Sequence, residues 1–226
     1  MKRTGFFFLA FFSCLSAYSQ VDGNYSYSVG LKGYSILQMP KMLNQTNSQR
    51  YETVYLNGII AKFNDNQINY RVNANYLGKS MTFYNSCRSC EVARGTRTDY
   101  SFKIGFEKNI NYARVQPYFG SDIGIRISSF DGEIRTRNAK SNKLPYNVDT
   151  DKTGFILSPI LGIKYTPIRQ VSVFAESNVD FYYSYERQES IEQDVNNTRT
   201  FTSFNKWEFL LNPISFGILI HLVDKN

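Results

Sequence analysis

Long apolar runs, cysteine and histidine are scarce in this sequence of 226 residues. Its mean hydropathy is −0.37, and no apolar run approaches the roughly 18 to 20 residues that a membrane-spanning helix needs, which excludes a helical membrane bundle. Hydrolytic mechanisms often use a histidine as a general base, and this sequence offers only one histidine for that role. The excess of basic over acidic residues, 26 against 19, comes with no basic stripe and no nucleic-acid motif, so nucleic acid is not expected as a partner.

Aromatic residues, in contrast, are abundant. The chain holds 17 Tyr and 18 Phe, and aromatic side chains make up 16% of it, too large a share for a disordered protein. Tyrosine and phenylalanine favour strands, and the accompanying Asn and Ser favour turns. The length corresponds to one domain or at most two small ones. The composition therefore favours strands and turns over helices.

The first residues have the pattern of a secretory signal peptide. A basic start at residues 1–4 precedes the apolar run 5–12, which is too short to span a bilayer, and a small-x-small cleavage site follows at residues 17–19. A membrane anchor is the alternative, and a lipoprotein signal would need an aliphatic residue three positions before Cys14. We therefore predict a signal peptide over residues 1–19 and a single domain over residues 20–226.

Apolar and polar residues alternate with a period of two along most of the mature chain. Tyr70 and Val72, for example, flank Arg71 in a run that continues to Tyr76. This is the spacing of strands with one apolar and one polar face, and it differs from helical spacing. It predicts eight strands, at residues 25–31, 51–63, 68–76, 100–107, 115–127, 155–165, 171–181 and 214–222.

The predicted connections alternate between short and long. Tight turns are expected at 64–67, 108–114 and 166–170, and longer polar loops at 38–50, 78–98, 129–153 and 186–203. An up-and-down meander with short turns at one end and long loops at the other is the layout of a bacterial outer-membrane barrel. The predicted fold is therefore all-β, an eight-stranded antiparallel up-and-down transmembrane β-barrel.

The polar faces of the predicted strands carry a balanced set of charges. The interior of an eight-stranded barrel has room only for packed side chains, and the Tyr and Phe of the apolar faces would overfill it. If the apolar faces instead meet lipid, charged residues meet inside, where burial requires that they pair. We therefore predict a salt-bridged plug that joins Lys32, Arg71, Lys103, Arg126 and Lys164 to Asp99, Glu107, Asp122, Glu176 and Asp180.

Aromatic residues recur near the predicted strand ends, as expected of side chains at two membrane interfaces. Those toward the short turns are Tyr25, Tyr70, Phe106 and Tyr165. Those toward the long loops are Tyr76, Tyr100, Phe155 and Phe181. Pro117 and Pro159 fall within predicted strands, where a bulge or a strand end is expected because proline donates no ladder hydrogen bond.

Several segments resemble the outer-membrane β-barrel domain proteins of Bacteroidota. They are the signal peptide that ends before Gln20, the segments 115–120 (VQPYFG) and 163–167 (IKYTP), and the start of the last strand at 212–217 (NPISFG). That family is similar in layout to small barrels of the OmpA or OmpX kind, and the likeness extends over residues 21–226. It implies a location in the cell outer membrane and carries over no catalytic, ligand or cofactor residue. The chain departs from the family at its end, LVDKN, where such barrels usually finish on an aromatic residue.

The pair Cys87 and Cys90 lies in the second long loop. Because an exported thiol pair is usually oxidised, we predict a small disulfide ring that stiffens the loop. Metal binding is an alternative, although a CxxC supplies only two of the four ligands of a structural zinc. A redox role would need a βαβ context that the sequence lacks. No metal or cofactor is expected.

His221 and two carboxylates are the candidates for catalysis. His221 lies near the end of the last strand, at the end of the barrel opposite to the outer leaflet where lipid A-modifying enzymes act, so a structural imidazole is the better interpretation. Glu176 and Asp180 lie four residues apart on one strand face, a spacing compatible with acid–base chemistry. Neighbouring basic residues favour ion pairs for both.

These observations predict a non-enzymatic outer-membrane barrel with a structural, adhesive or accessory role in an envelope complex and with its long loops extracellular. Its expected partners are outer-membrane lipid and other envelope proteins. One alternative is a narrow passive channel. Another is a soluble lipocalin-like barrel that binds an apolar ligand, which requires the Tyr and Phe stripes to face inward. An enzyme of lipid A or peptide hydrolysis that depends on His221 is the last.

Overall fold

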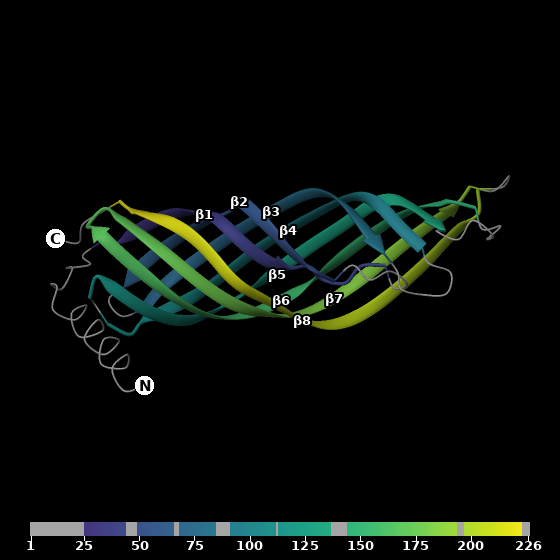
Figure 1. The fold of residues 1–226 in the computed structure, drawn as a ribbon. Helices are drawn as coiled ribbons and strands as arrows, with labels where there is room; N and C mark the ends of the chain where they lie inside the picture. The colour runs from purple at the N-terminus through teal and green to yellow at the C-terminus, as the bar shows by residue number, and fades with distance from the viewer. Residues whose placement is uncertain are drawn as a thin grey trace, which may run out of the picture.

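The computed structural model describes residues 25–43, 49–65, 68–84, 91–111, 113–136, 144–193 and 197–222. They form a closed ring of eight antiparallel strands in which each strand pairs with the next and the last pairs with the first (Figure 1). The predicted eight-stranded up-and-down β-barrel is confirmed. No described segment is a helix long and apolar enough to cross a membrane. The strands are β1 (Tyr27–Gln38), β2 (Tyr51–Asp65), β3 (Ile68–Tyr84), β4 (Glu91–Asn109), β5 (Val115–Thr136), β6 (Tyr146–Ile168), β7 (Val171–Glu192) and β8 (Arg199–His221).

The outer face of the barrel carries a continuous apolar belt. Leu161, for example, exposes 68% of its surface on the outside. Aromatic pairs lie at the two ends of the belt, with ring centroids 5.4 Å apart for Tyr27 and Phe63 toward the short turns and 5.0 Å apart for Tyr76 and Tyr100 toward the long loops. A closed barrel with an outward apolar band between aromatic residues is suited to span a bilayer. The apolar stripes thus face outward, which removes the condition for a lipocalin-like barrel.

The strands continue beyond the belt toward the long loops, so the predicted loop boundaries are wrong. The sequence pattern places a loop over 129–153, whereas β5 extends to Thr136 and β6 begins at Tyr146. β3, β4, β7 and β8 likewise reach into segments predicted to be loops. We refer to these outer portions as the extension, which comprises residues 78–84, 91–98, 129–136, 146–153, 186–192 and 199–205.

The polarity of the two strand faces reverses in the extension. Phe130 and Ile134 point inward and are buried, whereas Asp131 and Asp149 point outward and are exposed. This reversal is explained if the outside of the extension meets water and not lipid, because charged side chains are favoured on an outer face only where water solvates them. The inward apolar side chains form one cluster, the upper core, made of Met39, Met42, Leu43, Val54, Leu77, Met81, Phe83, Ala93, Phe130, Ile134, Tyr146 and Val148.

The wall of the barrel is irregular around β2. Leu56 adopts a φ of 47°, a left-handed conformation that is unfavourable for a branched side chain. The pairing of β2 with β3 ends at Gly58 and Asn75. Above this point β2 pairs with β1 as far as Tyr51, and β3 pairs with β4 as far as its end. The two strands therefore separate toward the long loops.

The prolines lie where the ladder tolerates them. Pro159 of β6 points outward, and the pairing of β6 with β7 passes from Leu157 to Ile160 without it. The register is the same on both sides of this gap, with Leu157 opposite Phe181 and Ile160 opposite Asn178. The ladder is thus interrupted at Pro159 without the bulge that the sequence led us to expect.

Candidate functional site

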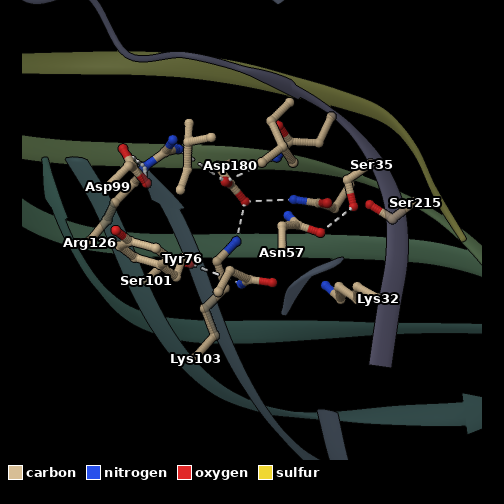
Figure 2. A pocket seen from close by; sticks show the side chains of 15 residues that line it. Lys32, Ser35, Asn57, Tyr76, Asp99, Ser101, Lys103, Arg126, Asp180 and Ser215 are labelled. Carbon is tan, nitrogen blue, oxygen red and sulfur yellow. Dashed lines mark hydrogen bonds and ion pairs between the residues drawn. The ribbon is translucent and has the colours of Figure 1, made fainter. Parts of the chain in front are cut away.

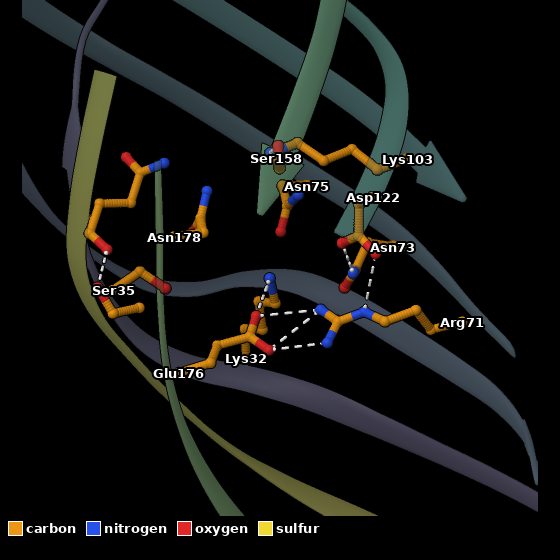
Figure 3. Close-up of polar contacts among 12 residues, drawn as sticks. Lys32, Ser35, Arg71, Asn73, Asn75, Lys103, Asp122, Ser158, Glu176 and Asn178 are labelled. Carbon is orange, nitrogen blue, oxygen red and sulfur yellow. Dashed lines mark hydrogen bonds and ion pairs between the residues drawn. The ribbon is translucent and has the colours of Figure 1, made fainter. Parts of the chain in front are cut away.

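Arg71 of β3 is the centre of a charged layer that crosses the half of the lumen nearer the short turns. Its Nη1 lies 3.0 Å from Oε2 of Glu176 and 3.1 Å from Oε2 of Glu107, and its Nε lies 3.2 Å from Oδ1 of Asp122. Figure 3 shows the guanidinium between Glu176 and Asp122. The Tyr118 hydroxyl also donates to Glu176, at 3.2 Å. One cation thus binds three carboxylates from β4, β5 and β7.

Two lysines complete this layer, which we refer to as the Arg71 layer. Lys32 Nζ lies 2.9 Å from Glu176 Oε1, and Lys62 Nζ lies 2.7 Å from Glu107 Oε2. Lys62 is buried but is absent from the predicted network. The left-handed residue Leu56 interrupts the alternation of β2, and this obscures which face of the strand is inward. The outward Phe63 next to it is the signal that could have identified it.

A second set of ion pairs lies above the Arg71 layer, on the side of the long loops. Figure 2 shows Lys103 and Asp180 pointing toward each other. Lys103 Nζ lies 2.7 Å from Asp180 Oδ1 and 2.8 Å from the Ser158 hydroxyl. Arg126 Nε donates to Asp99 Oδ1 at 2.9 Å. Both pairs are almost fully buried. All ten residues of the predicted charge network lie inside the barrel, namely Lys32, Arg71, Asp99, Lys103, Glu107, Asp122, Arg126, Lys164, Glu176 and Asp180.

The base of the lumen differs from the predicted pairing. The sequence places Lys164 in an ion pair, but in the described part of the chain its Nζ contacts the Tyr25 hydroxyl, at 3.2 Å, and no carboxylate lies within 4.0 Å of it. The His221 ring stacks on Tyr25 with centroids 3.6 Å apart. Its two ring nitrogens lie 2.8 Å and 2.7 Å from the hydroxyls of Ser28 and Ser172. An imidazole held on both nitrogens and one face fits a structural role.

The segment Met39–Leu43 enters the lumen within the extension. The sequence assigns it to a polar outer loop, yet Met39, Met42 and Leu43 are buried in the upper core. A polar clamp holds its backbone. The amides of Lys41 and Leu43 donate to Glu208 and Glu186, at 2.7 and 2.9 Å.

Two basic side chains donate to carbonyl groups of the same segment. Arg97 Nη2 donates to the Pro40 carbonyl at 3.0 Å, and Lys152 Nζ donates to the Lys41 carbonyl at 2.7 Å. Lys152 also pairs with Glu208. No periodicity in the sequence identifies this segment because it is not a strand. The signal it offers is Met39 and Met42, two large apolar residues in an otherwise polar connection.

A small cavity remains between the Arg71 layer and the upper core. Its volume is about 40 Å³, and Figure 2 shows the polar side chains that line it, among them Lys32, Lys103, Asn57 and Asp180. This is enough space for a few waters but not for a continuous pore. The lumen is therefore closed twice, by the Arg71 layer and by the Met39–Leu43 segment with the upper core.

Two sets of predicted residues fall outside the described part of the chain. These are the signal peptide over 1–19 and the predicted disulfide partners Cys87 and Cys90. Within the described residues, no group of three or more His, Cys, Asp or Glu side chains is arranged to hold a metal ion.

An acidic cluster lies on the outside of the extension. Asp149 of β6 is the register partner of Asp131 on β5 and of Glu189 on β7. Partial burial and the nearby charges of Asp151, Asp131 and Glu189 raise the pKa of Asp149 above its ordinary value. The negative charges around Asp149 thus disfavour ionisation of this one carboxyl group.

Comparison with solved structures identifies two outer-membrane proteins of similar fold. The outer membrane protein OprG from Pseudomonas aeruginosa aligns with a TM-score of 0.52 and 11% identity, over 88% of this chain and 98% of that chain. A major outer membrane protein from Thermus thermophilus aligns with a TM-score of 0.52 and 9% identity, over 88% of this chain and 100% of that chain. No family model and no curated protein sequence matches. The chain therefore shares its fold with outer-membrane barrels, and its apolar belt fits that location.

Proposed function

We propose that this chain is a non-enzymatic, non-conducting barrel of the outer membrane with a structural, adhesive or accessory role in an envelope assembly. The observation that carries the proposal is the double closure of the lumen. Solute would have to pass both the ion pairs of Arg71 and the buried Met39–Leu43 segment. What remains accessible is the belt, which contacts outer-membrane lipid, and the extension with its loops, which we place on the extracellular side.

Conductance across planar bilayers tests the closed lumen. We expect the purified wild-type barrel to show no discrete current steps. A double variant, Arg71→Ala with Glu208→Gln, weakens both closures and should conduct, whereas each single variant should stay closed because the other closure remains. Discrete steps from the wild-type barrel would contradict the proposal.

Purification from native envelopes in mild detergent tests the accessory role. We expect another envelope protein to co-elute in stoichiometric amounts, identified by mass spectrometry. A matched variant with outward charges of the extension reversed, Asp131→Lys with Asp149→Lys, should keep the barrel folded and lose the partner. A wild-type barrel that elutes alone would argue against an accessory role and leave adhesion through the loops to be tested by cell-binding assays.

A narrow passive channel is the second candidate function, and the cavity above the Arg71 layer favours it. That cavity is polar, and it lies on the barrel axis between the two closures. Conduction would require both closures to open together. The same bilayer experiment separates the two candidates, because a channel gives steps in the wild-type protein.

A further inference from the structure

β8 continues further toward the long loops than its neighbour β1. The ladder between the two strands ends at Ile36 with Ile214, and β1 itself ends at Gln38. On its other side, β8 stays paired with β7 as far as Arg199. No described residue forms a backbone ladder with residues 199–207 on the β1 side. This part of β8 is therefore an open strand edge, which we refer to as the β8 edge.

The backbone of the β8 edge directs hydrogen-bonding groups away from β7. The amide of Leu211 donates to Gln38 Oε1 at 2.7 Å, so the backbone groups of Leu211 face the β1 side. In an antiparallel ladder, the N–H and C=O of every second residue point to the same neighbour. The register with β7 is unbroken from Asn212 to Arg199. Four residues of the edge therefore have backbone groups on the open side, namely Phe201, Ser203, Asn205 and Trp207.

The β8 edge also lacks the usual protection of an exposed strand. Residues 199–203 are all exposed, whereas buried and exposed residues alternate over 146–153 of β6. The stretch 200–205 (TFTSFN) holds no charged residue and no proline, and its threonine and phenylalanine favour strands. Native proteins usually protect such an edge with charge, proline or a covering segment, because unpaired backbone groups are a template for another strand.

The corresponding edge of β3 is protected. The β2–β3 ladder ends at Asn75, which leaves the outer part of β3 without a backbone partner on the β2 side. Lys79 Nζ lies 2.6 Å from Glu52 Oε2 across this gap. Arg50 Nη1 donates to the Thr82 carbonyl at 3.2 Å. Within the described residues, no such bridge reaches the β8 edge from the β1 side, so the two edges of the extension differ.

A second copy of the chain in the same membrane does not fit beside the β8 edge as a strand. Copies in one membrane are related by an axis along the membrane normal. Transmembrane strands are tilted by about 45°, so the β8 strands of two such copies cross at about 90°. Paired strands in a sheet cross at only about 20 to 25°. The geometry therefore favours a segment whose direction is not fixed by the membrane.

The charges beside the β8 edge do not select an occupant, because they are already paired. Arg199 Nη1 lies 3.3 Å from Glu189 Oε1, and Lys206 Nζ lies 3.0 Å from Glu186 Oε2. What the edge offers is a row of backbone donors and acceptors about 26 Å long. Threonine and phenylalanine side chains flank this row. An extended segment with uncharged, strand-forming side chains is complementary to it.

We propose that the β8 edge binds an extended, uncharged segment of another envelope protein, which adds to the barrel as a further strand. The inference rests on the accessory role proposed above, and it specifies the surface and the kind of partner. The two fail separately. If the partner of the wild-type barrel also co-elutes with a Ser203→Pro variant, this inference is overturned and the accessory role stands.

A synthetic peptide is the probe for the β8 edge. It alternates threonine and valine over ten residues with a lysine at each end, and its control has proline in place of each valine. The barrel is held in phosphatidylcholine nanodiscs, and NMR measures the hydrogen exchange of its backbone amides. Without peptide, we expect Ser203 and Asn205 to exchange at least tenfold faster than Thr202 and Phe204, which face β7.

The threonine–valine peptide should slow the exchange of Ser203 and Asn205 at least tenfold, and the proline peptide should leave it unchanged. Equal exchange of the four amides without peptide would show that the edge is not open. Exchange that the threonine–valine peptide does not slow would show that the edge does not accept a strand. Either result overturns the proposal.

Three proline variants locate the binding, which is measured by the fluorescence anisotropy of labelled peptide. Ser203→Pro and Asn205→Pro each remove a donor on the open side and leave the β7 ladder intact, so both should bind at least tenfold more weakly. Ser80→Pro is the matched control on the protected edge, because the Thr82 carbonyl two residues further on faces β2. It should bind as the wild type does.

Heat-modifiable migration on gels confirms that each variant is folded. Undiminished peptide binding by folded Ser203→Pro and Asn205→Pro overturns the proposal. Nanodiscs that join in pairs with the wild-type barrel, but not with Ser203→Pro, would identify a second copy in an opposed membrane as the occupant. That result also overturns the proposal.

Discussion

Replacement of Arg71 by alanine measures how much the Arg71 layer stabilises the barrel. After the change, Glu107 keeps its contact with Lys62 and Glu176 keeps its contact with Lys32. Asp122 keeps only a hydrogen bond from Asn73, at 3.0 Å. Removing one partner of a buried ion pair costs about 3 to 5 kcal/mol, because the other charge stays buried without compensation. Water that enters the vacated space lowers this cost, so we expect Arg71→Ala to lower the free energy of unfolding by about 3 kcal/mol.

The assay is equilibrium unfolding in urea of the barrel in lipid vesicles, and two further variants give it a sharp control. Arg135→Ala breaks an exposed ion pair with Glu133, and it should cost far less than Arg71→Ala because water screens the pair. Arg71→Ala combined with Asp122→Asn neutralises the abandoned carboxylate and should recover about 1 to 2 kcal/mol of the loss. If Arg71→Ala costs no more than Arg135→Ala, or if Asp122→Asn recovers nothing, the reasoning is refuted.

Three further predictions concern the wall, the outer charges and the inserted segment. In a strand, alanine is usually more stabilising than glycine, and at position 56 we expect the opposite. In urea unfolding, Leu56→Gly should be about 1 kcal/mol more stable than Leu56→Ala, because glycine alone adopts the left-handed backbone without strain. If Leu56→Ala is the more stable variant, the strain is absent. The pKa of Asp149 is raised in the fold, so its charge destabilises the barrel at neutral pH and this penalty disappears as the pH falls through the folded pKa. Asp149→Asn should therefore raise the free energy of unfolding at pH 7, by less than about 1 kcal/mol. Near pH 3, below the ordinary aspartate pKa of about 3.9, the substitution should have no effect. A gain in stability that persists at pH 3 would contradict this prediction. Glu208→Gln should speed hydrogen exchange of the Lys41 amide about tenfold, because the amide loses a charged acceptor, and unchanged exchange would show that Glu208 does not hold the segment.

The sequence predicts the part of the barrel that lies in lipid but not the extension, and the difference has a physical reason. In the belt, outward residues such as Ile123 and Leu157 must be apolar and inward residues such as Asp122 must be polar, so the pattern is strict. In the extension, Phe130 and Val148 face inward instead, and a search for outward apolar stripes reads these strands as loops. The sequence does show the reversed pattern once one allows that the outer face meets lipid in the belt and water in the extension.

The interior charges could be listed from the sequence, but their partners could not. Which carboxylate Arg71 binds depends on the stagger between strands that are not adjacent, since Glu176 comes from β7. The sequence pattern does not place Lys62 in the interior, because the irregular backbone at Leu56 interrupts the alternation of inward and outward residues in β2. The entry of Met39–Leu43 into the lumen depends on acceptors more than a hundred residues away, Glu186 and Glu208, which no local pattern reveals.

The reversal of polarity also fixes the height at which the barrel displays its loops. From Phe155, the outermost apolar residue on the outward face of β6, to Tyr146, the strand rises about 30 Å along its length, or about 20 Å above the hydrocarbon after allowance for a tilt of about 45°. The headgroup layer of one leaflet occupies only about 5 to 8 Å of that distance. Sliding the barrel inward would carry Asp149 and Asp151 into hydrocarbon, so the bilayer holds it at a set depth. The outer ends of the strands therefore lie well above the lipid surface, where another macromolecule can dock without touching lipid.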